Sequence, residues 1–126
     1  MAGKDAPKGQ LSKAEIEVLN KKYIGGIKEI ILDRKVEEIR DEKGIKKERV
    51  IKPGVAFYLR KPDRATLKYA SSKAMKMDGI DLNTAGEVIL KKCFVAGDEE
   101  VKNLDFYFFR ACMECYTYMQ ELMGFV

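Results

Sequence analysis

Hydrophobic and polar positions along this 126-residue chain predict a helix followed by short strands. Ser12 and Glu15 have the spacing of a capping box, which predicts a helix over about 13–22 that a pair of glycines ends. Residues 27–32 are branched and apolar and lie next to that glycine pair, which favours a strand. The same isoleucines also have helical spacing, so a helix that continues to Ile39 is the alternative.

A highly charged stretch follows this strand. Within it, Val36 and Ile39 indicate a hairpin, and residues 49–51 are expected to form a second short strand. Residues 55–60 are rich in aromatic and branched side chains, which predicts a further strand that Pro62 ends.

From Asp63 onward the pattern becomes helical. Asp63 is a suitable N-cap for a helix that is expected to end at Gly79. Thr84 and Glu87 repeat the capping-box spacing and predict a third helix that ends at Gly97. The apolar faces of these two helices are expected to carry Leu67, Ala70, Ala74 and Met77 in the first, and Val88, Ile89, Cys93 and Phe94 in the second.

These elements predict an α+β domain: a short N-terminal helix, a small antiparallel β-hairpin or sheet, and then a C-terminal bundle of three helices. Residues 1–10 are polar and contain Gly and Pro, so they are expected to form a flexible N-terminal tail. Residues 11–126 are expected to form a single α+β domain. Its helix and strands lie in residues 11–62 and its helical part in residues 63–126, so the strands gather in the first half.

The last predicted helix, over about 104–123, is the most apolar segment of the chain. Seven of the twelve aromatic residues lie between 106 and 125. A surface helix normally buries one stripe, so this helix has more apolar surface than a small domain is expected to cover. The alternative is that it is the central helix of the domain, enclosed by the other elements. Its polar residues form one narrow stripe in which the first two are spaced to pair: Arg110, Glu114, Thr117 and Glu121.

We therefore expect the last helix to bind a partner protein or a second copy of the chain. Tyrosines and methionines suit such a surface because they make amphipathic and adaptable contacts. The candidate partner-binding residues are Phe106, Tyr107, Phe109, Met113, Tyr116, Met119 and Met123.

Composition narrows the class of protein. Apolar residues make up 46% of the chain and charged residues 35%, which excludes a wholly disordered chain. No apolar run is long enough to predict a membrane span, and the N-terminus lacks the apolar core of a secretory signal. Three cysteines are an odd number, so a reduced, cytoplasmic setting is the simpler expectation.

Charge is unevenly distributed along the chain. Residues 1–52 and 53–92 each have a net charge of +4, and residues 93–126 have a net charge of −4. The basic segments also contain many acidic residues, a pattern that is typical of a solvated surface rather than of a nucleic-acid-binding face. Nucleic acid is therefore an unlikely partner, and the acidic C-terminal third is suited to pair with the basic part of a neighbouring copy or partner.

No group of residues predicts catalysis, a metal site or a cofactor site. The chain has no histidine, which removes the commonest general base and metal ligand. Cys112 and Cys115 form a Cys-x-x-Cys pair on an apolar helix, where core packing is the favoured interpretation. Asp78 and Asp81 lack the spacing of a calcium loop and are better explained as helix caps.

Four stretches, in this order and spacing, resemble the small tail assembly chaperones of long-tailed bacteriophages and prophages. They are the sequence LSKAEI at 11–16, FYLRKPDR at 57–64, AGEVILKKCFVAGD at 85–98, and the apolar C-terminal helix. Together they span residues 11–124. The chain departs from the family in a longer charged insertion over residues 34–52.

This resemblance implies a non-enzymatic protein in the cytoplasm of a bacterial host cell. Such chaperones bind the tape-measure protein of the tail, keep its apolar helices soluble, help to bring tail-tube proteins to it, and leave before the virion is complete. A homo-oligomer is also possible.

Two other classes of function stay open. One is a structural virion or connector protein that remains in its assembly. The other is a small nucleic-acid-binding protein that uses Arg60, Lys61, Arg64, Lys68, Lys73 and Lys76.

Overall fold

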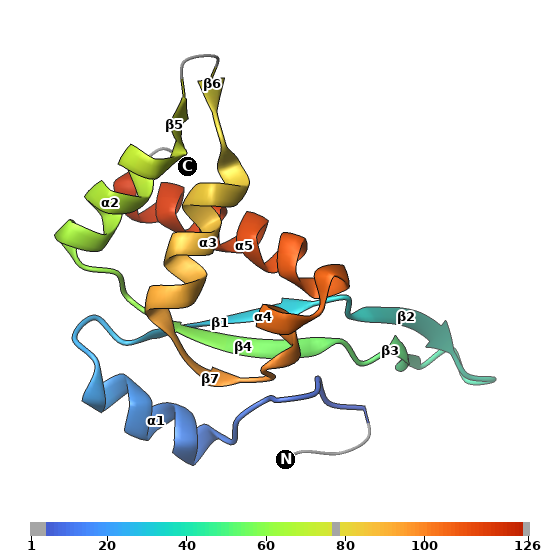
Figure 1. Ribbon diagram of the computed structural model, residues 1–126. Helices are drawn as coiled ribbons and strands as arrows, with labels where there is room; N and C mark the ends of the chain where they lie inside the picture. The colour runs from blue at the N-terminus through green and yellow to red at the C-terminus, as the bar shows by residue number, and fades with distance from the viewer. Residues whose placement is uncertain (1–4, 77–78, 125–126) are drawn as a thin grey trace.

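The computed structural model describes residues 5–76 and 79–124, and it has the mixed α+β architecture that the sequence predicts (Figure 1). The helices are α1 (Lys13–Lys22), α2 (Arg64–Ala74), α3 (Leu82–Cys93), α4 (Glu100–Asn103) and α5 (Asp105–Met123). The strands are β1 (Ile27–Leu32), β2 (Lys35–Arg40), β3 (Lys46–Lys52), β4 (Val55–Arg60), β5 (Met75–Lys76), β6 (Gly79–Ile80) and β7 (Phe94–Gly97).

Several predicted elements are confirmed to the residue. The helix over 13–22 begins with the predicted capping box, in which the Ser12 hydroxyl accepts from the Glu15 N–H. Residues 27–32 form a strand, which excludes the alternative of a continued helix. Residues 55–60 form β4. Asp63 is the N-cap of α2 because its carboxylate accepts from the Thr66 N–H at 2.7 Å.

The main sheet has three antiparallel strands in the order β1-β4-β7. Its third strand was not predicted, because residues 94–97 continue the apolar pattern of the preceding helix. The third helix ends at Cys93 rather than at Gly97, and the next four residues pair with β4. The prediction that all strands lie in the first half of the chain is therefore wrong.

Two other helix boundaries differ from the prediction. α2 ends at Ala74 instead of continuing toward Gly79, because Met75 leaves the helix with extended backbone angles and joins the two-residue strand β5. α3 begins at Leu82, and its N-cap is Asp81, which accepts from the N–H and the hydroxyl of Thr84. Thr84 therefore donates to the N-cap residue Asp81 and is not the N-cap itself. The predicted positions Met77 and Asp78 lie outside the described residues.

The hydrophobic core lies between one face of the sheet and the helices α2, α3 and α5. Alternate residues of a strand face opposite sides, and Phe57 and Leu59 of β4 point into this core. Helices α3 and α5 cross very closely at Gly86. A Cβ atom at that position would lie only 1.8 Å from the carbonyl oxygen of Cys112, so the crossing requires glycine.

The N-terminal segment covers the opposite face of the sheet. The hydroxyl of Tyr58 accepts from the Leu11 N–H at 3.0 Å and donates to Glu29 Oε2 at 2.6 Å. Lys8 forms backbone hydrogen bonds to Gly54 and Ala56 beside β4. Residues 5–10 therefore belong to the folded domain, which corrects the prediction of a flexible tail for that part of residues 1–10.

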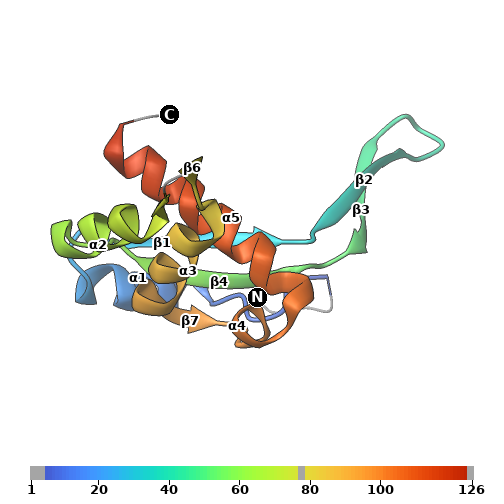
Figure 2. The ribbon, with the colours of Figure 1, turned by 45° about the horizontal axis from the view of Figure 1, so that its top comes forward.

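A two-stranded arm projects from the domain. The β-arm, residues 33–54, consists of β2 and β3 in an antiparallel pair, and it extends away from the other elements in both ribbon views (Figures 1 and 2). The arm is the charged insertion of the sequence. Cross-strand ion pairs join Glu37 to Arg49 and Glu38 to Lys46, at 3.4 and 3.3 Å.

Candidate partner-binding site

Helix α5 is buried along one side only. Ala111, Cys112, Cys115 and Met119 are buried against the core, whereas other apolar side chains of the same helix are exposed. The alternative that the last helix is fully enclosed is therefore excluded. Gly124 adopts a left-handed conformation and ends the helix after Met123, in agreement with the predicted range of about 104–123.

The seven candidate partner-binding residues fall into three groups. Phe106, Phe109, Met113 and Met123 are exposed. Tyr107 and Tyr116 are half-buried and pack against the core. Met119 is buried with 4% exposure, so it cannot contact a partner without rearrangement of the domain. Helical periodicity alone does not reveal which side of an apolar helix faces the core, which is why Met119 was included.

Three of the exposed residues make a continuous apolar row. Phe106, Phe109 and Met113 are 55%, 55% and 43% exposed. Their spacing of three and then four residues places them on one side of the helix, over a length of about 10 Å. We call these three residues the α5 stripe.

A shallow hollow of about 370 Å³ lies beside the α5 stripe. It separates the helix from the end of β1 and the start of the β-arm. Its lining residues are Ile31, Leu32, Asp33, Phe109, Arg110, Met113 and Glu114. The sequence did not identify the contribution of β1, because Ile31 and Leu32 have no feature that distinguishes them from other strand residues.

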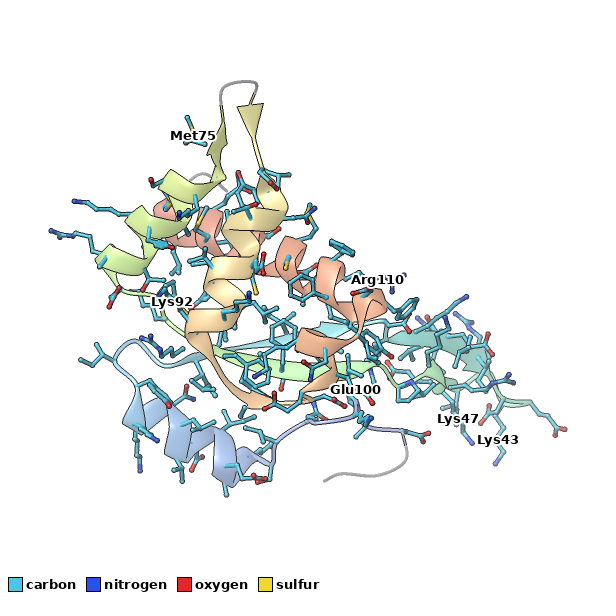
Figure 3. The ribbon with its side chains drawn as sticks, viewed as in Figure 1. Lys43, Lys47, Met75, Lys92, Glu100 and Arg110 are labelled. Carbon is cyan, nitrogen blue, oxygen red and sulfur yellow. The ribbon has the colours of Figure 1, made fainter. Side chains whose placement is uncertain are left out.

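Arg110 holds one edge of the hollow. Its guanidinium contacts Asp33 Oδ1 at 3.3 Å and lies 4.7 Å from the ring centre of Phe106 (Figure 3). The predicted pair of Arg110 with Glu114 is replaced by the pair with Asp33, an acid that the fold brings close from 77 positions away. This arrangement leaves Glu114 beside the hollow as an exposed acidic side chain.

The far end of α5 carries a smaller apolar surface. Tyr116, Met119 and Met123 line a hollow of about 180 Å³ together with Ala74 and Met75. Met75 is 66% exposed. This surface is separate from the α5 stripe, so the candidate residues are not all brought together.

The three cysteines are free and buried in the core, as their apolar surroundings predict. Burial raises the pKa of the Cys112 thiol to about 11 and also raises the pKa values of Cys93 and Cys115. Each therefore stays protonated at neutral pH, which is the unreactive form. Within residues 5–76 and 79–124, no three side chains of metal-ligating type converge on one point.

The chain matches no family model, no curated protein and no solved structure. Among the described helices, none combines the length and the apolar character that crossing a membrane requires.

Proposed function

We propose that this protein is a non-enzymatic binding protein that holds an amphipathic helix of a partner against the α5 stripe. The observation that carries this proposal is the exposure of Phe106, Phe109 and Met113 in one row beside a hollow. Full burial of a large apolar side chain contributes about 1.5–3 kcal/mol of favourable free energy. Burial of this row by a partner would therefore contribute substantially to the free energy of binding.

A helix is the partner element that fits this surface best. Side chains spaced three and four residues apart form a ridge, and ridges of one helix pack into the grooves of another. The hollow between α5 and the end of β1 provides space for the partner's own apolar residues. Recognition of an amphipathic helix in an apolar groove is a recurrent binding mode.

The biological role that we propose is that of a phage tail assembly chaperone. The resemblance of residues 11–124 to that family supports this assignment. On this proposal the partner is the tape-measure protein, whose apolar helices are kept soluble while tail-tube proteins assemble around it. The β-arm and the many surface charges favour solubility of such a complex.

Co-expression tests the proposal. A helical fragment of the tape-measure protein encoded in the same phage or prophage genome is expressed with and without this chain, and the soluble fraction of the fragment is measured. We expect the chain to raise that fraction. Replacement of Phe109 and Met113 by Asp should abolish the effect and weaken binding by about 2–4 kcal/mol.

Val18→Asp combined with Ile24→Asp is the matched control. Both residues are exposed apolar side chains outside α5, so the same change of chemistry should leave binding intact. Equal loss in the control pair would show that the α5 stripe has no special role. Detection of the protein in purified virions would instead favour a structural virion protein.

A further inference from the structure

Basic side chains gather on the opposite end of the domain from the β-arm. They come from the end of α1, the end of β4, and the exposed sides of α2 and α3. We call this set the basic face: Lys22, Arg60, Lys61, Arg64, Lys68, Lys73, Lys91 and Lys92. Figure 3 places Lys92 at one end of the molecule and Lys43 and Lys47 of the β-arm at the other.

The basic face contains few acids. Among the described residues that line its two hollows, the acids are Asp63 and Glu87. The carboxylate of Asp63 is engaged as the N-cap of α2, and that of Glu87 pairs with Lys91 at 2.7 Å. The net charge of the set is therefore +6, which exceeds the +4 of the whole chain. The remaining residues together are negative.

Two adjoining hollows run along this face. The first, of about 700 Å³, lies between the end of α1 and the start of α2 and is lined by Lys22, Arg60, Lys61 and Arg64 among others. The second, of about 460 Å³, lies between α2 and α3 and is lined by Lys73, Lys91 and Lys92 among others. A hydrogen bond links their linings, because the guanidinium of Arg60 in the first hollow donates to the backbone carbonyl of Lys92 in the second at 3.0 Å.

Each hollow also contains a tyrosine. Tyr69 lines the second hollow, is 41% exposed, and has the ammonium groups of Lys73 and Lys92 each 5.5 Å from its ring centre. Tyr23 lines the first hollow, with the Lys22 ammonium 5.4 Å from its ring centre. Each aromatic ring therefore lies beside at least one ammonium group that can contact a phosphate.

The fold separates charges that the sequence interleaves. The acids of the charged insertion lie on the β-arm, where Glu37, Glu38 and Asp41 pair with basic residues of the arm itself. They are therefore not available to neutralise the basic face. Because these acids are absent from the basic face, the mixed charge pattern of the sequence does not disfavour nucleic acid at this surface.

We propose that the basic face binds single-stranded nucleic acid. A cationic groove that follows the backbone, with aromatic rings on which bases stack, is the arrangement that binds single strands without sequence preference. The cations would contact phosphates, and Tyr69 and Tyr23 would each stack on a base. This inference does not depend on the proposed function, because the basic face and the α5 stripe share no residue.

Fluorescence anisotropy of a labelled oligothymidylate of about fifteen nucleotides tests the proposal. The logarithm of the association constant should fall linearly with the logarithm of the salt concentration. If about five phosphates are contacted, the slope is about −3.5. Absence of binding at low salt would overturn the proposal.

Lys61→Glu combined with Arg64→Glu should weaken binding at least about tenfold at low salt. Lys43→Glu combined with Lys47→Glu, on the β-arm, is the matched control, because it changes the net charge of the protein by the same amount. The control should bind nearly as well as the wild type. Equal loss in both pairs would show that only net charge matters and would overturn the assignment to this face.

Two further measurements distinguish a nucleic acid from an acidic peptide. Tyr69→Ala should weaken oligonucleotide binding several-fold, whereas Tyr69→Phe should retain it, because stacking needs the ring and not the hydroxyl. Polyglutamate of equal charge should compete poorly. If polyglutamate binds as tightly as the oligonucleotide and Tyr69→Ala has no effect, the partner is an acidic protein segment and the proposal is wrong.

Discussion

The α5 stripe and the basic face are two surfaces built in opposite ways. The stripe comes from one helix and consists of three apolar side chains, and Asp33 at its edge forms ion pairs with Arg110 and Lys52. The basic face comes from four elements and consists mainly of charges. The binding free energy that comes from apolar burial is nearly independent of salt concentration, whereas affinity that comes from contacts with phosphates falls steeply as the salt concentration rises. The two surfaces should therefore be separable by mutation and by ionic strength.

The most damaging change that we predict removes the scaffold on which both surfaces depend. Gly86→Ala places a methyl group where α3 crosses the backbone of Cys112, so the two helices must move apart. We expect a loss of about 3 kcal/mol or more in the free energy of unfolding. Chemical denaturation followed by circular dichroism measures this loss, and binding at both surfaces should fall with it.

Gly44→Ala is the control for this variant. Gly44 lies in the turn of the β-arm, where an added methyl group meets no atom within 4 Å but the backbone has a φ of +78°. We expect a loss of only about 1 kcal/mol from the left-handed backbone. Equal losses at both glycines would contradict the close helix crossing.

Salt should separate the two surfaces by the next largest effect. Between about 50 and about 200 mM salt, oligonucleotide affinity should fall roughly a hundredfold, given the slope for about five phosphates. Binding of the partner helix should change by less than about threefold over the same range. Isothermal titration at several salt concentrations measures both. Parallel salt dependence would mean that the two ligands share one surface.

The smallest predicted effect concerns Tyr58, which joins the N-terminal segment to the sheet through its hydroxyl. Tyr58→Phe removes the hydrogen bonds to Leu11 and Glu29, so the free energy of unfolding should fall by about 1–2 kcal/mol at neutral pH. Burial and then the hydrogen bond to Glu29 raise the pKa of Tyr58 from 10.0 to about 12. Between these values the unfolded chain has released the proton and the folded chain still holds it, so stability falls as pH rises.

The wild type has the larger free energy of unfolding at neutral pH, and its difference from Tyr58→Phe should therefore shrink as the pH rises from 10 to 12. Both proteins contain the same other titrating groups, so the difference between their free energies of unfolding isolates Tyr58. A difference that stays constant over this pH range would show that the hydroxyl is not held as described.

Local signals account for the elements that the sequence predicted correctly. The capping box at Ser12, the Asp63 cap and the strand over 55–60, which is rich in aromatic and branched side chains, depend on neighbouring residues, so they are visible without the fold. The α5 stripe was partly predictable for the same reason. Periodicity identified an apolar helix, but only packing decides that Met119 is buried while Phe109 is exposed.

Features that depend on distant segments could not be predicted in this way. Residues 94–97 form a strand because β4 offers an open edge, although their apolar pattern continues that of α3. Residues 5–10 are polar, yet they are held by β4 and by the ion pairs of Lys8 with Asp98 and Glu100. The basic face needs the fold to carry the acids of the insertion out onto the β-arm.

On our proposal, the α5 stripe binds a helix of a partner protein. Hydrogen–deuterium exchange of this chain, with and without the tape-measure fragment, can locate the bound surface. We expect slower exchange in residues 104–114 and at the end of β1 when the fragment is bound. Protection confined to the basic face or the β-arm, with residues 104–114 unchanged, would contradict it.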